Sequence, residues 1–142
     1  MIVFVDGNVP CRVNSRQATK NWLRAVVEAY GFRLGDLSIV SYTDDGLLEF
    51  NQAYLEHDTY TDIITFDYSE GKTLSGDLLI SFERVKENAD NQLVVFDDEL
   101  RRVMVHGVLH LIGFKDKSEG DAKAMRDAED RALTMFHVEH RN

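Results

Sequence analysis

The segment from Val103 to Phe114 is apolar on nearly every side when it is drawn as a helix, and this constrains the chain more than any other feature. The rest of the protein has to surround such a helix, so the sequence predicts a buried central helix. His106 and His110 lie four residues apart within it. Side chains at that spacing project in the same direction, about 40° apart around the axis and one turn along it. The fold must therefore provide partners for two imidazoles.

The two histidines and a nearby carboxylate have the spacing of a metal site. A histidine pair four apart on a helix is more often incidental, but two buried imidazoles without partners would cost roughly 1–3 kcal/mol each. Gly113 can end the helix and turn the chain back, so that Asp116 supplies a third ligand. Two histidines and one carboxylate leave a fourth position open, which is typical of catalytic zinc. We predict one Zn²⁺, or another divalent transition metal, on His106, His110 and Asp116.

Length and composition limit the remaining possibilities. The 142 residues, 44% of them hydrophobic, fit one domain over residues 1–142 with a core of its own. A net charge of −9 excludes nucleic-acid binding through global charge, so any such binding needs a local basic patch or a metal. The single cysteine, Cys11, excludes an internal disulfide and suits a reducing compartment. The N-terminal run Ile2–Val5 is too short for a signal peptide or membrane span, and we expect a cytoplasmic protein.

Hydrophobic periodicity predicts an α+β fold. Strands are expected at Ile2–Val5, Leu37–Tyr42, Asp62–Phe66 and Leu78–Ile80, with a polar loop over Asp67–Ser75. Helices are expected from Asn14 or Ser15 to about Tyr30, from Asp44 or Asp45 with Leu47, Leu48 and Tyr54 turned inward, over Phe82–Ala89, over about Asp98–Ile112, and from a capping box at Ser118 and Asp121 nearly to the C-terminus. The result is a small mixed sheet of about four strands covered by helices, with the metal site on a central helix and its following loop.

The spacing His-x3-His-x2-Gly-x2-Asp is similar to that of the metzincin proteases, which makes the expected arrangement zincin-like. Those proteases need a glutamate directly after the first histidine as the general base. This chain has Gly107 there, and a glycine cannot accept a proton. A metallopeptidase-like hydrolase is therefore disfavoured.

The motif His-Gly-x-Leu-His-Leu-x-Gly-Phe at residues 106–114 resembles that of the YbeY family of bacterial metal-dependent endoribonucleases. Residues 51–54, 61–66 and 76–81 match further family segments in the same order, so the resemblance covers about residues 47 to 125. It implies a zinc-bearing α+β fold that cleaves single-stranded RNA, acting at the 3′ end of small-subunit rRNA and in ribosome quality control. The implied partners are rRNA and the small ribosomal subunit with its proteins; neither a membrane nor DNA is expected.

The chain departs from the family pattern at two positions. The usual third ligand is histidine, whereas this chain has Asp116, whose charge should make the metal a weaker Lewis acid. The usual motif also has arginine directly after the tyrosine, and here Leu55 follows Tyr54. An arginine near a metal can clamp a phosphate, which leucine cannot do. A non-catalytic, metal-containing ribosome-assembly factor is therefore the alternative function.

Other polar residues carry weaker signals. Arg102 precedes His106 by four residues and is the candidate catalytic residue overlooking the metal, although the exposed start of a helix explains it better. Arg101, Lys115 and Lys117 complete the nearest basic candidates for RNA contact. Asp62, at a strand start, can orient a ligand imidazole or cap a turn. No general base is evident beside the metal helix, and His57, His137 and His140 fit solvated positions.

Overall fold

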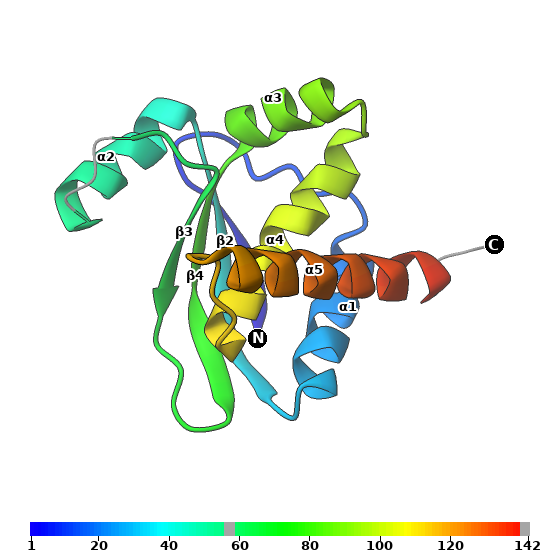
Figure 1. The fold of residues 1–142 in the computed structure, drawn as a ribbon. Coiled ribbons are helices and arrows are strands. Elements are labelled where there is room, and N and C mark those ends of the chain that lie inside the picture. Colours follow the sequence, from blue (N-terminus) through cyan, green and yellow to red (C-terminus); the bar gives the residue numbers. More distant parts are fainter. Residues whose placement is uncertain (56–58, 140–142) are drawn as a thin grey trace.

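The structure, a computed structural model, describes residues 1–55 and 59–139, and these residues form four strands and five helices (Figure 1). The strands are β1 (Ile2–Asp6), β2 (Arg33–Tyr42), β3 (Ile63–Asp67) and β4 (Thr73–Ser81). The helices are α1 (Arg16–Ala29), α2 (Asp44–Leu55), α3 (Phe82–Gln92), α4 (Phe96–Ile112) and α5 (Glu119–Glu139). The predicted α+β fold is confirmed.

The four strands form one mixed sheet in the order β1-β2-β4-β3. The pairs β1–β2 and β2–β4 are parallel, and β3 runs antiparallel to β4 as an edge strand. Two strands begin earlier than predicted: Arg33 pairs with Thr73 and Leu34 with Leu74. The expected loop over Asp67–Ser75 was therefore too long, because backbone pairing continues through polar and glycine residues where the apolar pattern is interrupted.

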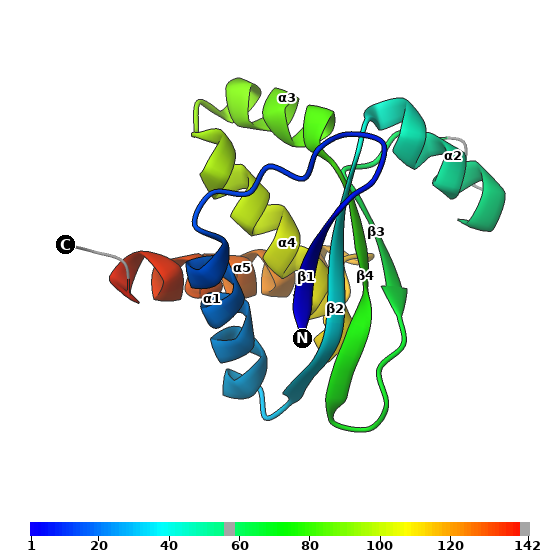
Figure 2. The same ribbon diagram turned by 180° about the vertical axis from the view of Figure 1, so that it is seen from behind.

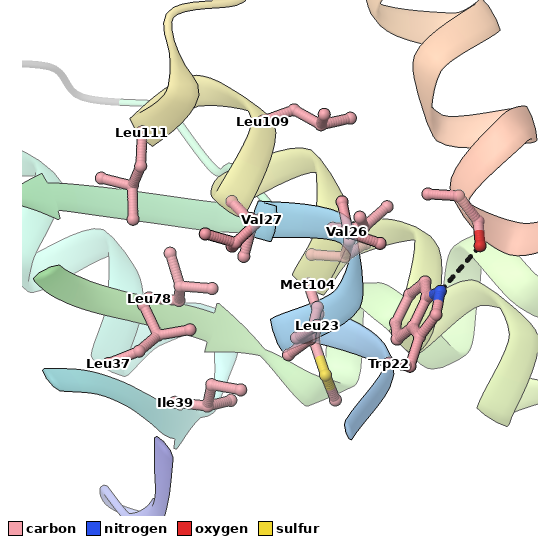
Figure 3. Packing of buried hydrophobic residues seen from close by; sticks show 14 of the residues in the cluster. Trp22, Leu23, Val26, Val27, Leu37, Ile39, Leu78, Met104, Leu109 and Leu111 are labelled. Atoms are coloured by element: carbon pink, nitrogen blue, oxygen red, sulfur yellow. Dashed lines mark hydrogen bonds between the residues drawn. The ribbon is translucent and has the colours of Figure 1, made fainter. Parts of the chain in front are cut away.

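The two faces of the sheet are covered unequally. Helices α1, α4 and α5 lie on one side of it, and α2 packs at one corner of the other side (Figures 1 and 2). On the first side, Figure 3 shows buried side chains of α1 and α4 meeting those of β2 and β4. On the second, Leu47 packs with Ile64 and Leu79. The expectation that Tyr54 turns inward is wrong: it is 66% exposed, because its ring packs against Phe50 and Phe66 at the margin of this corner and leaves the rest of its surface to solvent.

Helix α4 is the centre of the fold, as predicted. It contacts β3, β4, α1, α3 and α5, and nine of its seventeen residues are buried. Gly107 lets it lie close against the sheet, since a Cβ there would be 2.7 Å from Cδ2 of Leu78 and 2.8 Å from Cδ1 of Ile63. Within the described ranges, no helix combines the length and apolarity needed to cross a membrane.

Candidate metal centre

Helix α4 presents two imidazoles to the same side, one turn apart. The Nε2 atoms of His106 and His110 are 3.1 Å from each other. Their side chains are 24% and 30% exposed, so they lie at the margin of the core with one edge open to solvent. The predicted projection of the pair from one helix face is observed.

The turn after α4 completes the cluster. Gly113 has a φ of 127°, a conformation that favours glycine, and there the chain leaves the helix. The turn brings the carbonyl of Phe114 to 3.0 Å from Nδ1 of His110. It also places Oδ2 of Asp116 3.4 Å from Nε2 of both histidines. The three residues predicted as ligands therefore lie together, with one possible ligand atom from each within 4.8 Å of the other two.

His106 is held by a residue that the sequence analysis missed. Its Nδ1 lies 2.7 Å from Oε2 of Glu129, a carboxylate on α5 that is only 6% exposed. Burial alone would lower the pKa of His106, but the hydrogen bond and the charge of Glu129 outweigh burial and raise it. Burial would likewise raise the pKa of Glu129, and its contacts with His106 and Arg102 lower it instead. Glu129 falls in the buried stripe of α5 with Met125 and Ala132, and an acidic residue in such a stripe is the signal that could have identified it.

The donor set fits a tetrahedral divalent metal. A carbonyl can only accept, so His110 donates from Nδ1 to Phe114, and His106 donates from Nδ1 to the carboxylate of Glu129. In the neutral imidazoles both Nε2 atoms then carry lone pairs, and these face each other and a carboxylate oxygen. Three acceptors at 3.1–3.4 Å repel one another unless a cation lies between them. Ligand atoms around a tetrahedral zinc are separated by roughly 3.4 Å, which matches this spacing.

The cluster lies in a cleft of about 850 Å³ between α4, the edge strand β3 and the end of α2. Asp62 and Thr65 line it from the strand side, Leu55 from α2 and Lys117 from the loop after Asp116. Burial raises the pKa of Asp62, and the nearby His106 opposes that rise. Leu55 therefore faces the same cleft as the histidine pair.

Arg101 and Arg102 contact other parts of the molecule. The guanidinium of Arg102 binds Glu129 at 2.8 Å and Asp130 at 2.6 Å. Neither arginine is among the described residues that line the cleft. Arg101 pairs with Asp98 and lies over the ring of Phe136. Neither side chain therefore forms part of the basic lining of the cleft, although Arg102 lines a smaller neighbouring pocket together with Asp62 and His106.

The remaining histidines are not part of the described cluster. His137 is 56% exposed on α5, as expected for a solvated residue, with Asp98 3.6 Å away. The predictions for His57 and His140 lie outside the residues that the structure describes.

Comparisons with known proteins point to one family. The family model described as Endoribonuclease YbeY matches residues 8–137. A relative named Endoribonuclease YbeY from Flavobacterium psychrophilum is 51% identical over 118 residues, which is 83% of this chain and 84% of the relative. One of the same name from Parabacteroides distasonis is 45% identical over 140 residues, 99% of both chains. A solution structure of a Thermotoga maritima protein matches the fold with a TM-score of 0.68 at 23% identity, over 99% of this chain and 92% of that one.

Proposed function

Since the chain belongs to the Endoribonuclease YbeY family, we propose that it is a zinc-dependent endoribonuclease that cleaves single-stranded RNA, with residues 1–142 acting as one domain. As the family resemblance implies, its substrate is the 3′ region of small-subunit rRNA, and its partners are the small ribosomal subunit and the proteins of that subunit. It would act in the cytoplasm, where bacterial rRNA is made.

One observation carries the metal assignment: Nε2 of His106, Nε2 of His110 and Oδ2 of Asp116 converge at 3.1–3.4 Å, and all three are acceptors when both imidazoles are neutral with the proton on Nδ1. These residues would hold the zinc at the wall of the cleft. When bound there, the metal polarises a phosphate oxygen and lowers the pKa of the attacking water.

The other residues of the cleft have separate tasks. Lys117 lines the cleft and Lys115 is exposed beside the same turn, so both can attract the phosphate backbone despite the net charge of −9. Asp62 is the candidate proton acceptor, because its carboxylate lines the cleft together with His106. Leu55 contributes an apolar wall where a guanidinium would stabilise developing charge, so we expect slow cleavage by the isolated protein.

Metal content of protein purified without a histidine tag tests the site. We expect close to one equivalent of zinc in the wild type and its loss in His106→Ala and His110→Ala. Asp116→His should keep the metal, because imidazole is an equally suitable zinc ligand. His137→Ala, which removes an exposed histidine of α5, is the matched control and should bind as the wild type does. Unchanged metal content in both alanine variants would contradict the assignment.

Incubation of the zinc-loaded protein with end-labelled single-stranded RNA, and separately with casein, tests the activity. RNA cleavage without casein cleavage is expected, and Asp62→Asn should slow single-turnover cleavage about 10²–10⁴-fold at unchanged metal content. RNA binding with no cleavage by the wild type or by any of the variants would favour the alternative function, a non-catalytic ribosome-assembly factor. Charge reversal of Lys117 should flatten the salt dependence of binding, whereas the same change at Lys86 on α3 should not.

A further inference from the structure

A buried carboxylate connects the metal cluster to the last helix of the fold. Glu129, on α5, uses one oxygen for Nδ1 of His106 at 2.7 Å and the other for the guanidinium of Arg102 at 2.8 Å. Its side chain is 6% exposed, so water contributes little to either contact. Both oxygens of this carboxylate therefore have a fixed protein partner.

Arg102 is itself held on both sides. Its second terminal nitrogen lies 2.6 Å from Oδ1 of Asp130, the residue after Glu129, and its side chain is 21% exposed. A guanidinium can only donate, so the oxygen of Glu129 that faces Arg102 must be an acceptor. Arg102 thereby fixes the rotation of the Glu129 side chain and directs the second oxygen to His106.

The two ligand imidazoles are oriented by different means. His110 donates to the backbone carbonyl of Phe114, which belongs to the same turn that delivers Asp116. His106 relies on a side chain from a helix 23 residues further along the chain. The local segment thus contains three ligands but orients only one of its imidazoles.

We propose that Glu129, held in place by Arg102, is a positioning residue of the metal centre: it keeps the proton of His106 on Nδ1 and so leaves the Nε2 lone pair directed at the metal. The proposal rests on the proposed zinc site. Arg102, four residues before His106 on α4, acts through Glu129 rather than on substrate.

Replacement of Glu129 by glutamine tests this with almost no change in size. Because Arg102 can only donate, the amide oxygen of the glutamine must face Arg102, and its NH₂ group then faces His106. An NH₂ group next to Nδ1 favours the tautomer with the proton on Nε2, which blocks the metal-binding atom. Glu129→Gln should therefore weaken zinc binding about 10–100-fold in a chelator competition assay.

A second substitution should reverse the effect. In the double variant Glu129→Gln with Arg102→Met, the glutamine is free to turn its oxygen toward His106, and a substantial part of the zinc affinity should return. A merely structural role predicts the opposite, since the double variant loses more contacts than the single one. Asp130→Asn, which changes the exposed partner of Arg102, is the matched control and should stay within threefold of the wild type.

The tautomer itself can be measured without metal. Long-range ¹H–¹⁵N spectra of the metal-free protein, recorded above the pKa of His106, should show the proton on Nδ1 in the wild type and on Nε2 in Glu129→Gln. If the single variant does not fold, Glu129→Asp withdraws the carboxylate by one methylene, and at least a tenfold loss of zinc affinity is expected.

The outcomes separate this inference from the proposed function. A wild type that binds no zinc contradicts the proposed function and this inference with it. If the wild type binds zinc, two results with a folded Glu129→Gln variant would overturn the positioning role alone. The first is a zinc affinity within threefold of the wild type, and the second is a proton that stays on Nδ1 of His106.

Discussion

Replacing Trp22 with phenylalanine should destabilise the protein by disconnecting α1 from α5. Trp22 is fully buried, and its indole Nε1–H donates to the carbonyl of Ala132 at 2.7 Å (Figure 3). Loss of a buried hydrogen bond of this kind costs about 0.5–1.5 kcal/mol. The smaller ring leaves a cavity of roughly 40 Å³, worth about 1 kcal/mol, and the lost apolar burial adds about 0.8 kcal/mol.

These contributions give a loss of about 2–3 kcal/mol in the free energy of unfolding. For a chain of this size that corresponds to a fall in Tm of roughly 6–10 °C. Urea unfolding should be followed by circular dichroism, because Trp22 is the single tryptophan and its fluorescence disappears with the substitution. Tyr54→Phe, at an aromatic residue that is 66% exposed, is the control and should change stability little. A loss below 0.5 kcal/mol for Trp22→Phe would refute the reasoning.

Three further predictions concern the metal helix and its cleft. In the metal-free protein, the raised pKa of His106 contributes stability that is lost as pH rises through that pKa, and the lowered pKa of Glu129 contributes stability that is lost as pH falls through it. The stabilisation by this His106–Glu129 pair should therefore be complete between the ordinary pKa values of the two side chains, 4.5 for Glu129 and 6.5 for His106. Thermal unfolding across pH 3–9 measures it, and a stabilisation that is largest at pH 9 would contradict the assignment. Gly107→Ala should lower the free energy of unfolding by up to about 2 kcal/mol in urea, because overpacking against the side chains of Leu78 and Ile63, about 1–3 kcal/mol, exceeds the gain of about 1 kcal/mol in helix propensity. A more stable variant would show that these two side chains move aside at little cost. Leu55→Arg should raise single-turnover RNA cleavage by about 10-fold or more at unchanged metal content, and no increase would argue against a phosphate beside that position.

The local parts of the site could be predicted from the sequence, and the parts contributed by distant segments could not. The spacing of His106 and His110, with Gly113 and Asp116 after them, encodes its own geometry, because helical periodicity and one turn bring the three ligands together. The contact between His106 and Glu129 depends on how α5 crosses α4, and no periodicity within either helix specifies that crossing.

The same distinction explains the errors in the fold. The strand β4 begins at Thr73 because its backbone pairs with β2, a long-range contact that hydrophobic patterns do not report. Tyr54 continues the apolar spacing of α2, but it packs against Phe50 and the edge-strand residue Phe66 while most of its surface stays exposed. Arg102 has the helical spacing of a residue above the cleft, yet two carboxylates on α5 bind its guanidinium, and these distant partners leave no signal in the local sequence.

The three ligands occupy one short stretch of chain, from His106 to Asp116, and this has a consequence for how zinc couples to folding. Closing so small a loop costs little entropy, so an unfolded chain can chelate the ion weakly with the same three side chains. Binding to the unfolded state subtracts from the stabilisation that a ligand gives the folded one. Saturating zinc should therefore raise Tm by less than the affinity of the folded protein implies, and the shortfall measures how much of the site exists before the chain has folded.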